Sequence, residues 1–302
     1  MIRRPDLTST LSRGVAASLL ASVLFGIISL IGGNLHGFTS EEAAAWRVIF
    51  ILLPLIALHT APRARAALGA VVRRIFRSPK LIVLLLVNSA IMGAQLWVFM
   101  WGAAHGHAQD VAFGYFLLPL VMVVVGRFLF RDRLVILQWC AVAAAAIGVL
   151  AQLVIAGGIT WPVLLIAGLY PVYFALRRAT GLDTMQVFFL EIIVLTLPAV
   201  AMIVFFYASE PGRGIPAAWP LMLTMAILSG IAMVCYILAS QLLPLSLFGL
   251  LSYLEPVLLL GASLLLGEVL TVGDIFVYIP IVIALVLLGL SGRPRKRPEF
   301  SR

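Results

Sequence analysis

The residues of this sequence best placed to do chemistry are the few ionisable side chains within its long apolar stretches. Glu255 lies about ten residues into such a stretch, roughly 15 Å at 1.5 Å per residue, and Pro256 follows it. A charged side chain at membrane depth costs roughly 2.5–3.5 kcal/mol on insertion scales, so it is a candidate for function. The Glu255 carboxylate can bind a cationic group or take up a proton. As a protonated acid it can instead bridge two helices.

Other charged residues lie in apolar stretches as well. Arg47 lies several residues into one stretch, beyond Glu41 and Glu42, and can clamp a carboxylate or extend back toward Glu42. Glu191 lies about six residues into a later stretch, about 10 Å along a helix. It can pair with an arginine of another helix or line a vestibule. Arg127 is close to the end of its stretch and is assigned to topology.

Polar and aromatic residues near these charges suggest a cavity wall. Asn88 and Gln95 are seven residues apart, so they share one face of a helix. With Trp101 and Tyr115 they can form a polar and aromatic wall, and Tyr253 is a further candidate near the carboxylate. The alternative is that the amides pack helices together and the tryptophan anchors at the membrane interface.

The remaining reactive residues do not form a catalytic or metal-binding pattern. His105 and His107 do not share a helix face, and we interpret them as an external turn, with Asp110 capping the next helix. Cys140 and Cys235 both lie in apolar stretches, which implies neither a disulfide nor a zinc site. No P-loop, Rossmann fingerprint, zinc-protease motif or nucleophile elbow occurs. The sequence therefore predicts no enzyme, cofactor or metal.

The composition excludes an ordinary soluble protein. Of the 302 residues, 63% are hydrophobic and 11% are charged, against roughly 45–50% and 25% in soluble domains. So few charged groups cannot coat a globule of this size. The sequence therefore predicts a polytopic membrane protein, and the net charge of +9 is interpreted as a topology signal rather than as nucleic-acid binding.

The apolar stretches predict ten transmembrane helices with short connections, and hence an all-α membrane fold. A bilayer core of about 30 Å needs about 20 apolar residues per helix. The uncharged stretches 134–176 and 214–254 are too long for one helix each, and Gly157-Gly158 and Pro244 offer breaks. The predicted spans are 14–33, 43–61, 81–104, 111–130, 134–156, 160–176, 185–207, 218–241, 245–266 and 272–290.

The positions of lysine and arginine predict the orientation of these helices. If ten helices alternate, all but Arg47, Arg127 and Arg213 of the 21 Lys and Arg residues fall on one side. Arg177 and Arg178 are assigned to a loop on that side. The positive-inside rule makes that side cytoplasmic. We therefore expect a multi-pass protein of the inner (plasma) membrane with both termini in the cytoplasm.

A weak internal repeat predicts two five-helix halves. An aromatic residue, a proline, an apolar helix and an acidic turn follow one another in both halves, so that Pro119 pairs with Pro256 and Asp132 with Glu268. Because five is an odd number, the second half enters the membrane from the opposite side, as in the inverted repeats of secondary transporters. The expected halves are residues 1–156 and 157–302.

At these residues the chain resembles the drug/metabolite transporter superfamily of the EamA type, through Tyr253-Leu-Glu-Pro-Val257 and Leu266-Gly-Glu268-Val-Leu270. The elements that resemble the RarD-like branch are Glu42 with Trp46-Arg47, Trp101-Gly-Ala-Ala-His-Gly-His107, Gly114-Tyr-Phe-Leu-Leu-Pro119, and Phe189-Leu-Glu191 with Pro198. The resemblance covers the whole chain. It implies a ten-helix inner-membrane permease with a central cavity that exports small metabolites or drugs. The chain departs from the branch at Gln95, where Asn is expected, and at Glu255, where a small residue is more common.

We therefore expect a secondary transporter that exports small metabolites or drugs by alternating access, with proton coupling and uniport both open. The site candidates are Glu255, Gln95, Arg47, Tyr253, Glu191, Trp101, Tyr115 and Asn88. Expected partners are a small-molecule substrate and the lipid bilayer, not nucleic acid, and a homodimer is left open. The alternative is a membrane sensor or an intramembrane enzyme. A sensor would need a soluble effector domain, and no predicted connection is long enough for one. An intramembrane enzyme would need a catalytic set at membrane depth, and His59 is the only histidine clearly within a predicted span.

Overall fold

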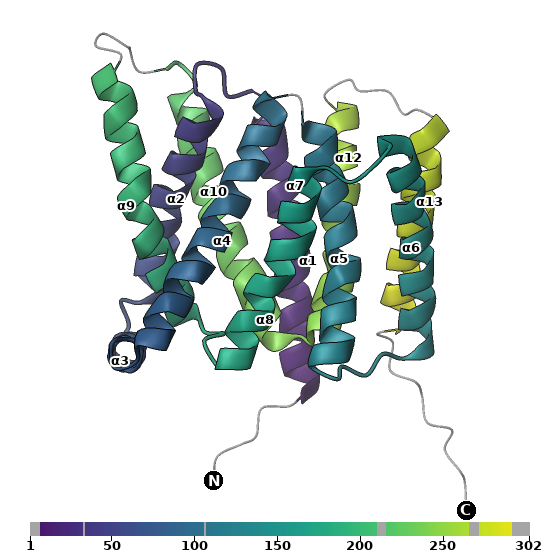
Figure 1. Ribbon diagram of the computed structural model, residues 1–302, viewed down its shortest axis with the longest axis horizontal. Helices are drawn as coiled ribbons and strands as arrows, with labels where there is room; N and C mark the ends of the chain where they lie inside the picture. Colours follow the sequence, from purple (N-terminus) through teal and green to yellow (C-terminus); the bar gives the residue numbers. More distant parts are fainter. Residues whose placement is uncertain (1–6, 33, 106, 210–215, 266–271, 292–302) are drawn as a thin grey trace, which may run out of the picture.

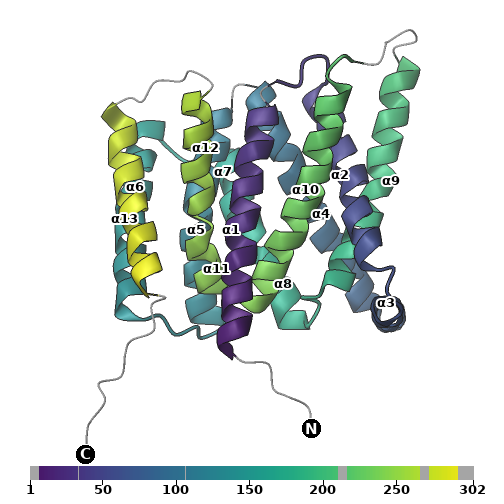
Figure 2. The ribbon, with the colours of Figure 1, turned by 180° about the vertical axis from the view of Figure 1, so that it is seen from behind.

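The long helices of the protein run roughly parallel to one another and form one layer that has a front row and a back row (Figures 1 and 2). The computed structural model describes residues 7–32, 34–105, 107–209, 216–265 and 272–291, and it contains no strand in these ranges. We call the end of the layer where α1 begins and α13 ends the lower end, as it is drawn in Figure 1. The described chain therefore enters and leaves the layer at the same face.

Thirteen α-helices and one π-helical turn, η1, make up the described chain. Their bounds are α1 Leu7–Gly32, α2 Ser40–Leu58, α3 Pro62–Phe76, α4 Pro79–Ala104, α5 Ala108–Leu129, α6 Ile136–Ala156, α7 Trp161–Leu164, η1 Leu165–Leu169, α8 Tyr170–Thr180, α9 Met185–Ser209, α10 Trp219–Leu242, α11 Leu245–Leu251, α12 Leu254–Leu265 and α13 Val272–Ser291.

Eight helices among the described residues are long and apolar enough to cross a membrane. These are α1, α4, α5, α6, α7 to α8 taken together, α9, α10 and α13. The pair α2–α3, bent by 119° at its break, would make a ninth. The number is lower than the predicted ten because α2 carries three charged residues and because the predicted span 245–266 is split. The protein is a multi-pass membrane protein on this evidence.

The predicted span 245–266 is broken near its middle. α11 ends at Leu251 and α12 begins at Leu254, so residues 252 and 253 interrupt the helix. Pro256 explains the break, because it has no backbone N–H to donate to the carbonyl one turn earlier and its ring crowds that turn. Pro119 has no such effect, since α5 runs past it without interruption. Glu268, the predicted partner of Asp132 in the repeat, lies outside the described residues.

Two other parts of the predicted organisation were wrong. The predicted span 160–176 continues to Thr180, so Arg177 and Arg178 lie in α8 rather than in a loop. The helix ends where Gly181 takes a left-handed conformation (φ 65°), which glycine adopts without strain. The connection between the second and third predicted spans, expected to be short, contains the 15-residue helix α3.

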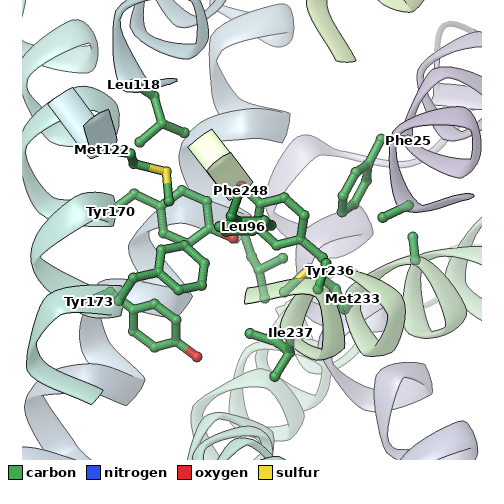
Figure 3. Packing of buried hydrophobic residues seen from close by; sticks show 14 of the residues in the cluster. Phe25, Leu96, Leu118, Met122, Tyr170, Tyr173, Met233, Tyr236, Ile237 and Phe248 are labelled. Atoms are coloured by element: carbon green, nitrogen blue, oxygen red, sulfur yellow. The ribbon is translucent and has the colours of Figure 1, made fainter. Parts of the chain in front are cut away.

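Aromatic side chains from both halves of the chain fill the centre of the layer (Figure 3). Tyr236 of α10 lies with its ring centroid 5.7 Å from that of Phe25 and 4.7 Å from that of Phe248. Tyr170 and Tyr173 of α8 extend the same cluster. These rings hold α1, α8, α10 and α11 together at the centre of the protein.

The outer faces of the helices carry large apolar side chains. Leu197 of α9, Val154 of α6 and Phe276 of α13 are among the most exposed. In water such a surface would drive aggregation, but against lipid tails it costs nothing. The exposed apolar surface therefore agrees with the multi-pass assignment.

Candidate functional site

A small cavity lies in the middle of the layer, where helices of both halves meet. Its walls come from α1, α2, α4, α5, α8, α10 and α12. It leaves about 30 Å³ for the centres of water-sized molecules, which is room for roughly two waters. The lining residues are Phe25, Arg47, Gln95, Leu96, Phe99, Tyr115, Tyr170, Tyr236 and Glu255.

Four of the eight residues predicted for the site meet in this cavity. They are Arg47, Gln95, Tyr115 and Glu255, and they come from four different helices. The structure therefore brings together the polar residues that the sequence places far apart.

Glu255 is positioned by the break between α11 and α12. It lies in the first turn of α12, where its backbone N–H donates to the carbonyl of Ser252 at 3.1 Å. Its side chain is 7% exposed. Within the described chain its carboxylate has no hydrogen-bond or ion-pair partner. The helix start favours a negative charge, because the first N–H groups of α12 have no helical acceptors.

Arg47 is 2% exposed and is held from three sides. Its Nε donates to Ser229 Oγ at 2.9 Å and its Nη1 to Met100 Sδ at 3.2 Å. The guanidinium carbon also lies 5.3 Å from the centre of the Phe99 ring, a cation–π distance. Its partners are on α10 and α4, so the side chain extends into the bundle rather than back along α2.

Gln95 connects the cavity to the π-helical turn. Its Nε2 donates to the carbonyl of Leu165 at 2.9 Å, in the first residue of η1. A π turn shifts the pattern of backbone hydrogen bonds and is often found at functional sites. The other amide atom, Oε1, is buried and has no partner among the described residues. Gln95, 2% exposed, thus offers an acceptor that the protein does not use.

The cavity combines opposite charges with aromatic walls. Arg47 and Glu255 line the same space, yet no ion pair within 4.0 Å joins them in the described chain. Tyr115 packs edge-on against Phe99, with 5.9 Å between ring centroids. Tyr170 of α8 adds a further aromatic ring to the wall. Such a site can hold a small organic molecule by its apolar part and contact charged groups at its ends.

Glu191, another predicted site residue, lies away from the cavity and pairs with Arg177. Both side chains are fully buried, and Nη1 of Arg177 lies 2.5 Å from Oε2 of Glu191. Tyr173 OH donates to the same oxygen at 2.8 Å and accepts from Arg177 at 2.9 Å. Of the two interpretations open for Glu191, the ion pair with an arginine of another helix is the one observed.

This buried network continues to the lower end of α8. Arg178 donates to the backbone carbonyls of Ser240 and Leu243, at the end of α10. Asp183, in the loop before α9, lies 3.7 Å from Arg177 and 3.9 Å from Arg178. Burial raises the pKa of the Asp183 carboxyl, and the two arginines offset only part of that rise. The contacts join α8, α9 and α10 and close this end of the layer.

The other three predicted site residues do not reach the cavity. Tyr253 is fully buried, and its hydroxyl has no partner among the described residues. Asn88 is fully buried too, and neither of its amide atoms has a partner in the described chain. Trp101 stacks on His105 and packs at a tilt against Trp97 and Trp161, near the upper end of α4. None of them lines the space that holds Glu255.

The histidines have structural partners in the described chain. His107 Nδ1 lies 2.7 Å from Asp110, so Asp110 contacts that ring and does not cap α5 as predicted. His59 stacks on Phe189, and its Nδ1 lies 2.8 Å from the carbonyl of Leu55. Among the described residues, no group of three His, Cys, Asp or Glu side chains could hold a metal ion.

Tyr170, Tyr236 and Phe25 line the cavity and were missed by the sequence analysis. The only signal for the two tyrosines was their position within an apolar stretch. Several other tyrosines of the chain share that position, so it does not identify those that line the cavity. A second space of about 150 Å³ lies between α2, α4 and α9 and shares Leu96 with the central cavity. Its walls are almost entirely apolar, with Glu41 as the charged exception.

Nearly the whole chain is similar in sequence to known proteins. No family model matches it. An uncharacterized transporter of Pasteurella multocida is 36% identical over 95% of this chain and 99% of its own length. The chloramphenicol-sensitive protein RarD of Pseudomonas aeruginosa is 37% identical over 96% of this chain and 98% of its own length. Protein RarD of Salmonella typhimurium is 28% identical over 85% of this chain and 87% of its own length.

The fold is also found among solved structures. A crystal structure matches 93% of this chain and 98% of its own chain with a TM-score of 0.67 at 18% sequence identity, which shows a shared fold only. The curated relatives carry the family assignment, because those at 36% and 37% identity cover nearly all of both chains. The chain belongs to the RarD-like family of transporters, and its role is that of a multi-pass membrane transporter.

Proposed function

We propose that this protein is a secondary transporter that exports small organic metabolites or drugs by alternating access. The observation that carries the proposal is the pair Arg47 and Glu255, buried in one cavity without an ion pair between them. Charged side chains at membrane depth are costly and face the bundle interior where they serve transport. A solute with anionic and cationic groups that enters the cavity can neutralise both side chains, and a proton can neutralise Glu255 alone.

The proposed substrate carries both polar and apolar groups. The guanidinium of Arg47 suits a carboxylate or other anionic group, and the carboxylate of Glu255 suits a cationic one. Gln95 Oε1 accepts a further hydrogen bond, and the tyrosine and phenylalanine rings suit an apolar body. The present cavity is too small for a metabolite, so this conformation corresponds to a closed state between the two open ones. One relative is named chloramphenicol-sensitive, which places chloramphenicol in the test panel.

We propose an inverted repeat of two five-helix halves, residues 1–156 and 157–302, with ten spans. The proposal counts α2 and the broken pair α11–α12 as spans, because both run parallel to the other helices in Figures 1 and 2. The α11–α12 break resembles the discontinuous helices at transporter sites. With an odd number of spans per half, each half enters the membrane from its own side.

Helix contacts support this repeat, because they occur in related pairs. Exchanging the halves relates α1 to α7–α8, α2 to α9, α4 to α10, α5 to α11–α12 and α6 to α13. The contact of α1 with α10 then corresponds to the contact of α8 with α4. The contact of α10 with α2 likewise corresponds to the contact of α4 with α9. The contacts α2–α9, α5–α11 and α6–α13 correspond to themselves. A two-fold axis between the halves produces this pattern.

The proposed location is the inner (plasma) membrane, with the lower end in the cytoplasm. The lower end carries α3, a helix with five arginines in or directly after it. Positive residues are retained on the cytoplasmic side. Proton coupling is assigned to Glu255, since its carboxylate is the only one among the described residues that lines the cavity.

The experiment is uptake into inside-out vesicles of a metabolite and drug panel that includes chloramphenicol. Wild type is compared with Glu255→Gln and with Arg127→Gln, an exposed arginine near the lower end of α5. We expect wild type and Arg127→Gln to accumulate one class of solute, and Glu255→Gln to lose its dependence on the pH gradient. If no solute moves and no proton flux appears, the transporter proposal fails. If Glu255→Gln behaves as wild type at every pH, coupling does not use Glu255.

A further inference from the structure

We propose that α3 binds the headgroups of anionic phospholipids at the membrane surface. The inference does not depend on the transported solute, because it concerns a surface distant from the central cavity. α3 is the helix that leaves the parallel arrangement: the bend between α2 and α3 is 119°. In both views it is seen end-on at the lower face of the layer (Figures 1 and 2). A helix in this position lies in the plane of the membrane surface.

Specific contacts hold α3 in place on the lower end. Ile75 is 1% exposed and packs with Leu85, Leu182 and Val187 of the neighbouring segments. Arg74 donates to the carbonyls of Thr180 and Gly181 at 3.1 and 3.2 Å. These carbonyls end α8, where helix carbonyls lack partners and a cation is favoured. The helix is therefore docked at a fixed rotation, and its other faces are presented in a defined direction.

The docked helix presents an arginine face away from the protein. At 100° per residue, Arg73 and Arg77 lie about 40° apart around the helix axis, and each is about 160° from the docked Ile75. Both are exposed, and neither has a hydrogen-bond or ion-pair partner among the described residues. A row of cations without acidic neighbours repels itself unless anions from outside the protein approach it.

An apolar flank lies beside the arginine face. Phe76 is 71% exposed and stands about 60° from Arg73 around the axis, on the side leading to the docked Ile75. A helix with cations on one face and a large apolar side chain beside them sits at the boundary between headgroups and acyl chains. Phe76 then enters the acyl region while Arg73 and Arg77 remain at phosphate level.

The charge of this segment is one-sided in the sequence as well. No Asp or Glu occurs between Glu42 and Asp110, whereas the stretch holds the arginines of α3 and Lys80. No acidic residue of the same segment can therefore neutralise the arginine face. Lipid phosphates are the anions present at high density at the height of α3, and polybasic segments beside spans are attracted to them. The occupant that fits is a phospholipid bilayer rich in anionic headgroups.

The test measures thermal unfolding of the full chain in two kinds of vesicle. One contains phosphatidylcholine alone, and the other contains phosphatidylcholine with phosphatidylglycerol at a ratio of three to one. Wild type is compared with the double variant Arg73→Gln/Arg77→Gln. The matched control is Arg131→Gln/Arg133→Gln, which removes the same charge from exposed residues of the α5–α6 loop at the same end.

We expect phosphatidylglycerol to raise the unfolding midpoint of wild type and of the loop variant, and the α3 variant to lose more than half of that rise. The proposal is overturned if wild type shows no rise, or if the two double variants lose it equally. A third arm adds inorganic phosphate to phosphatidylcholine vesicles. If free phosphate gives the same rise as the anionic lipid, the ligand is a soluble anion and the lipid assignment is wrong.

Discussion

At the scale of single residues, Arg47 is the side chain whose geometry is most demanding. Its planar guanidinium reaches Ser229 and Met100 together and lies over the Phe99 ring. A lysine ammonium keeps the charge but cannot match this arrangement. Arg47 therefore presents a positive charge to the cavity in a fixed position. A lysine would keep the charge but would not hold it in that position.

We expect Arg47→Lys to lower the transport rate by about tenfold or more, because one charge-assisted hydrogen bond is worth about 1.5–3 kcal/mol. The measurement is initial uptake of whichever solute wild type moves, normalised to folded protein in the vesicles. Arg127→Lys is the control, since its side chain is exposed, and it should transport as wild type. Equal rates for Arg47→Lys and wild type would show that charge alone suffices at this position.

The cavity could be predicted in part from the sequence. Arg47, Gln95 and Glu255 were found because each is a polar residue in an apolar stretch, where burial must have a cause. Tyr170 and Tyr236 were not found, since a tyrosine can sit at membrane depth for packing alone. Which of these residues share one space depends on the contacts between helices, and a single sequence without aligned relatives does not contain that information.

At the scale of helices, the contact of α5 with α11 is unusually close. A methyl group on Gly249 would stand 2.8 Å from the Cβ of Met122 and 3.1 Å from the carbonyl oxygen of Pro119. We expect Gly249→Ala to lower the free energy of unfolding by about 1–3 kcal/mol, since overpacking moves both helices. The check is the thermal unfolding midpoint in detergent. Gly289→Ala in α13, with nothing near its Cβ, should leave the midpoint unchanged or slightly higher.

The Arg177–Glu191 pair makes a second prediction about helices. Removing one member leaves a buried charge without its partner and costs about 3–5 kcal/mol, whereas replacing both by apolar residues is often nearly neutral. We expect Arg177→Met and Glu191→Leu to be strongly destabilising alone and much less so together. A double-mutant cycle of unfolding midpoints measures the difference. Strict additivity of the two single effects would mean that the pair contributes no coupling.

Some helix boundaries of this protein could not be predicted from the sequence alone. Arg177 and Arg178 looked like loop residues because two charges usually mark the edge of a span. α8 nevertheless continues through them, since Glu191, Asp183 and backbone carbonyls receive the charges. The spacing of Tyr173 and Arg177, one helix turn apart, was a usable signal for this. Pro256 was a signal for the helix break before Glu255. Pro119 does not interrupt α5, however, so a proline alone does not predict a break.

At the scale of the whole molecule, orientation can be tested directly. Cysteine is introduced at His36, in the upper connection between α1 and α2, or at Arg65 of α3, in a chain with Cys140 and Cys235 replaced by serine. We expect a charged maleimide to label the first site from outside intact cells and the second only in inside-out vesicles. The reverse pattern would place the lower end outside and would also reverse the proposed direction of transport.

In the proposed repeat, the break between α11 and α12 has no counterpart in the first half. α5 occupies the related position and is continuous from Ala108 to Leu129, although Pro119 lies within it. If two halves related by symmetry exchange shapes during the transport cycle, the opposite state has a bent α5 and a straight ninth span. Spin labels at the two ends of α5 should then move closer when the molecule passes to that opposite state. On this basis, the asymmetry between the two helices shows toward which of the two open states the closed molecule is shifted.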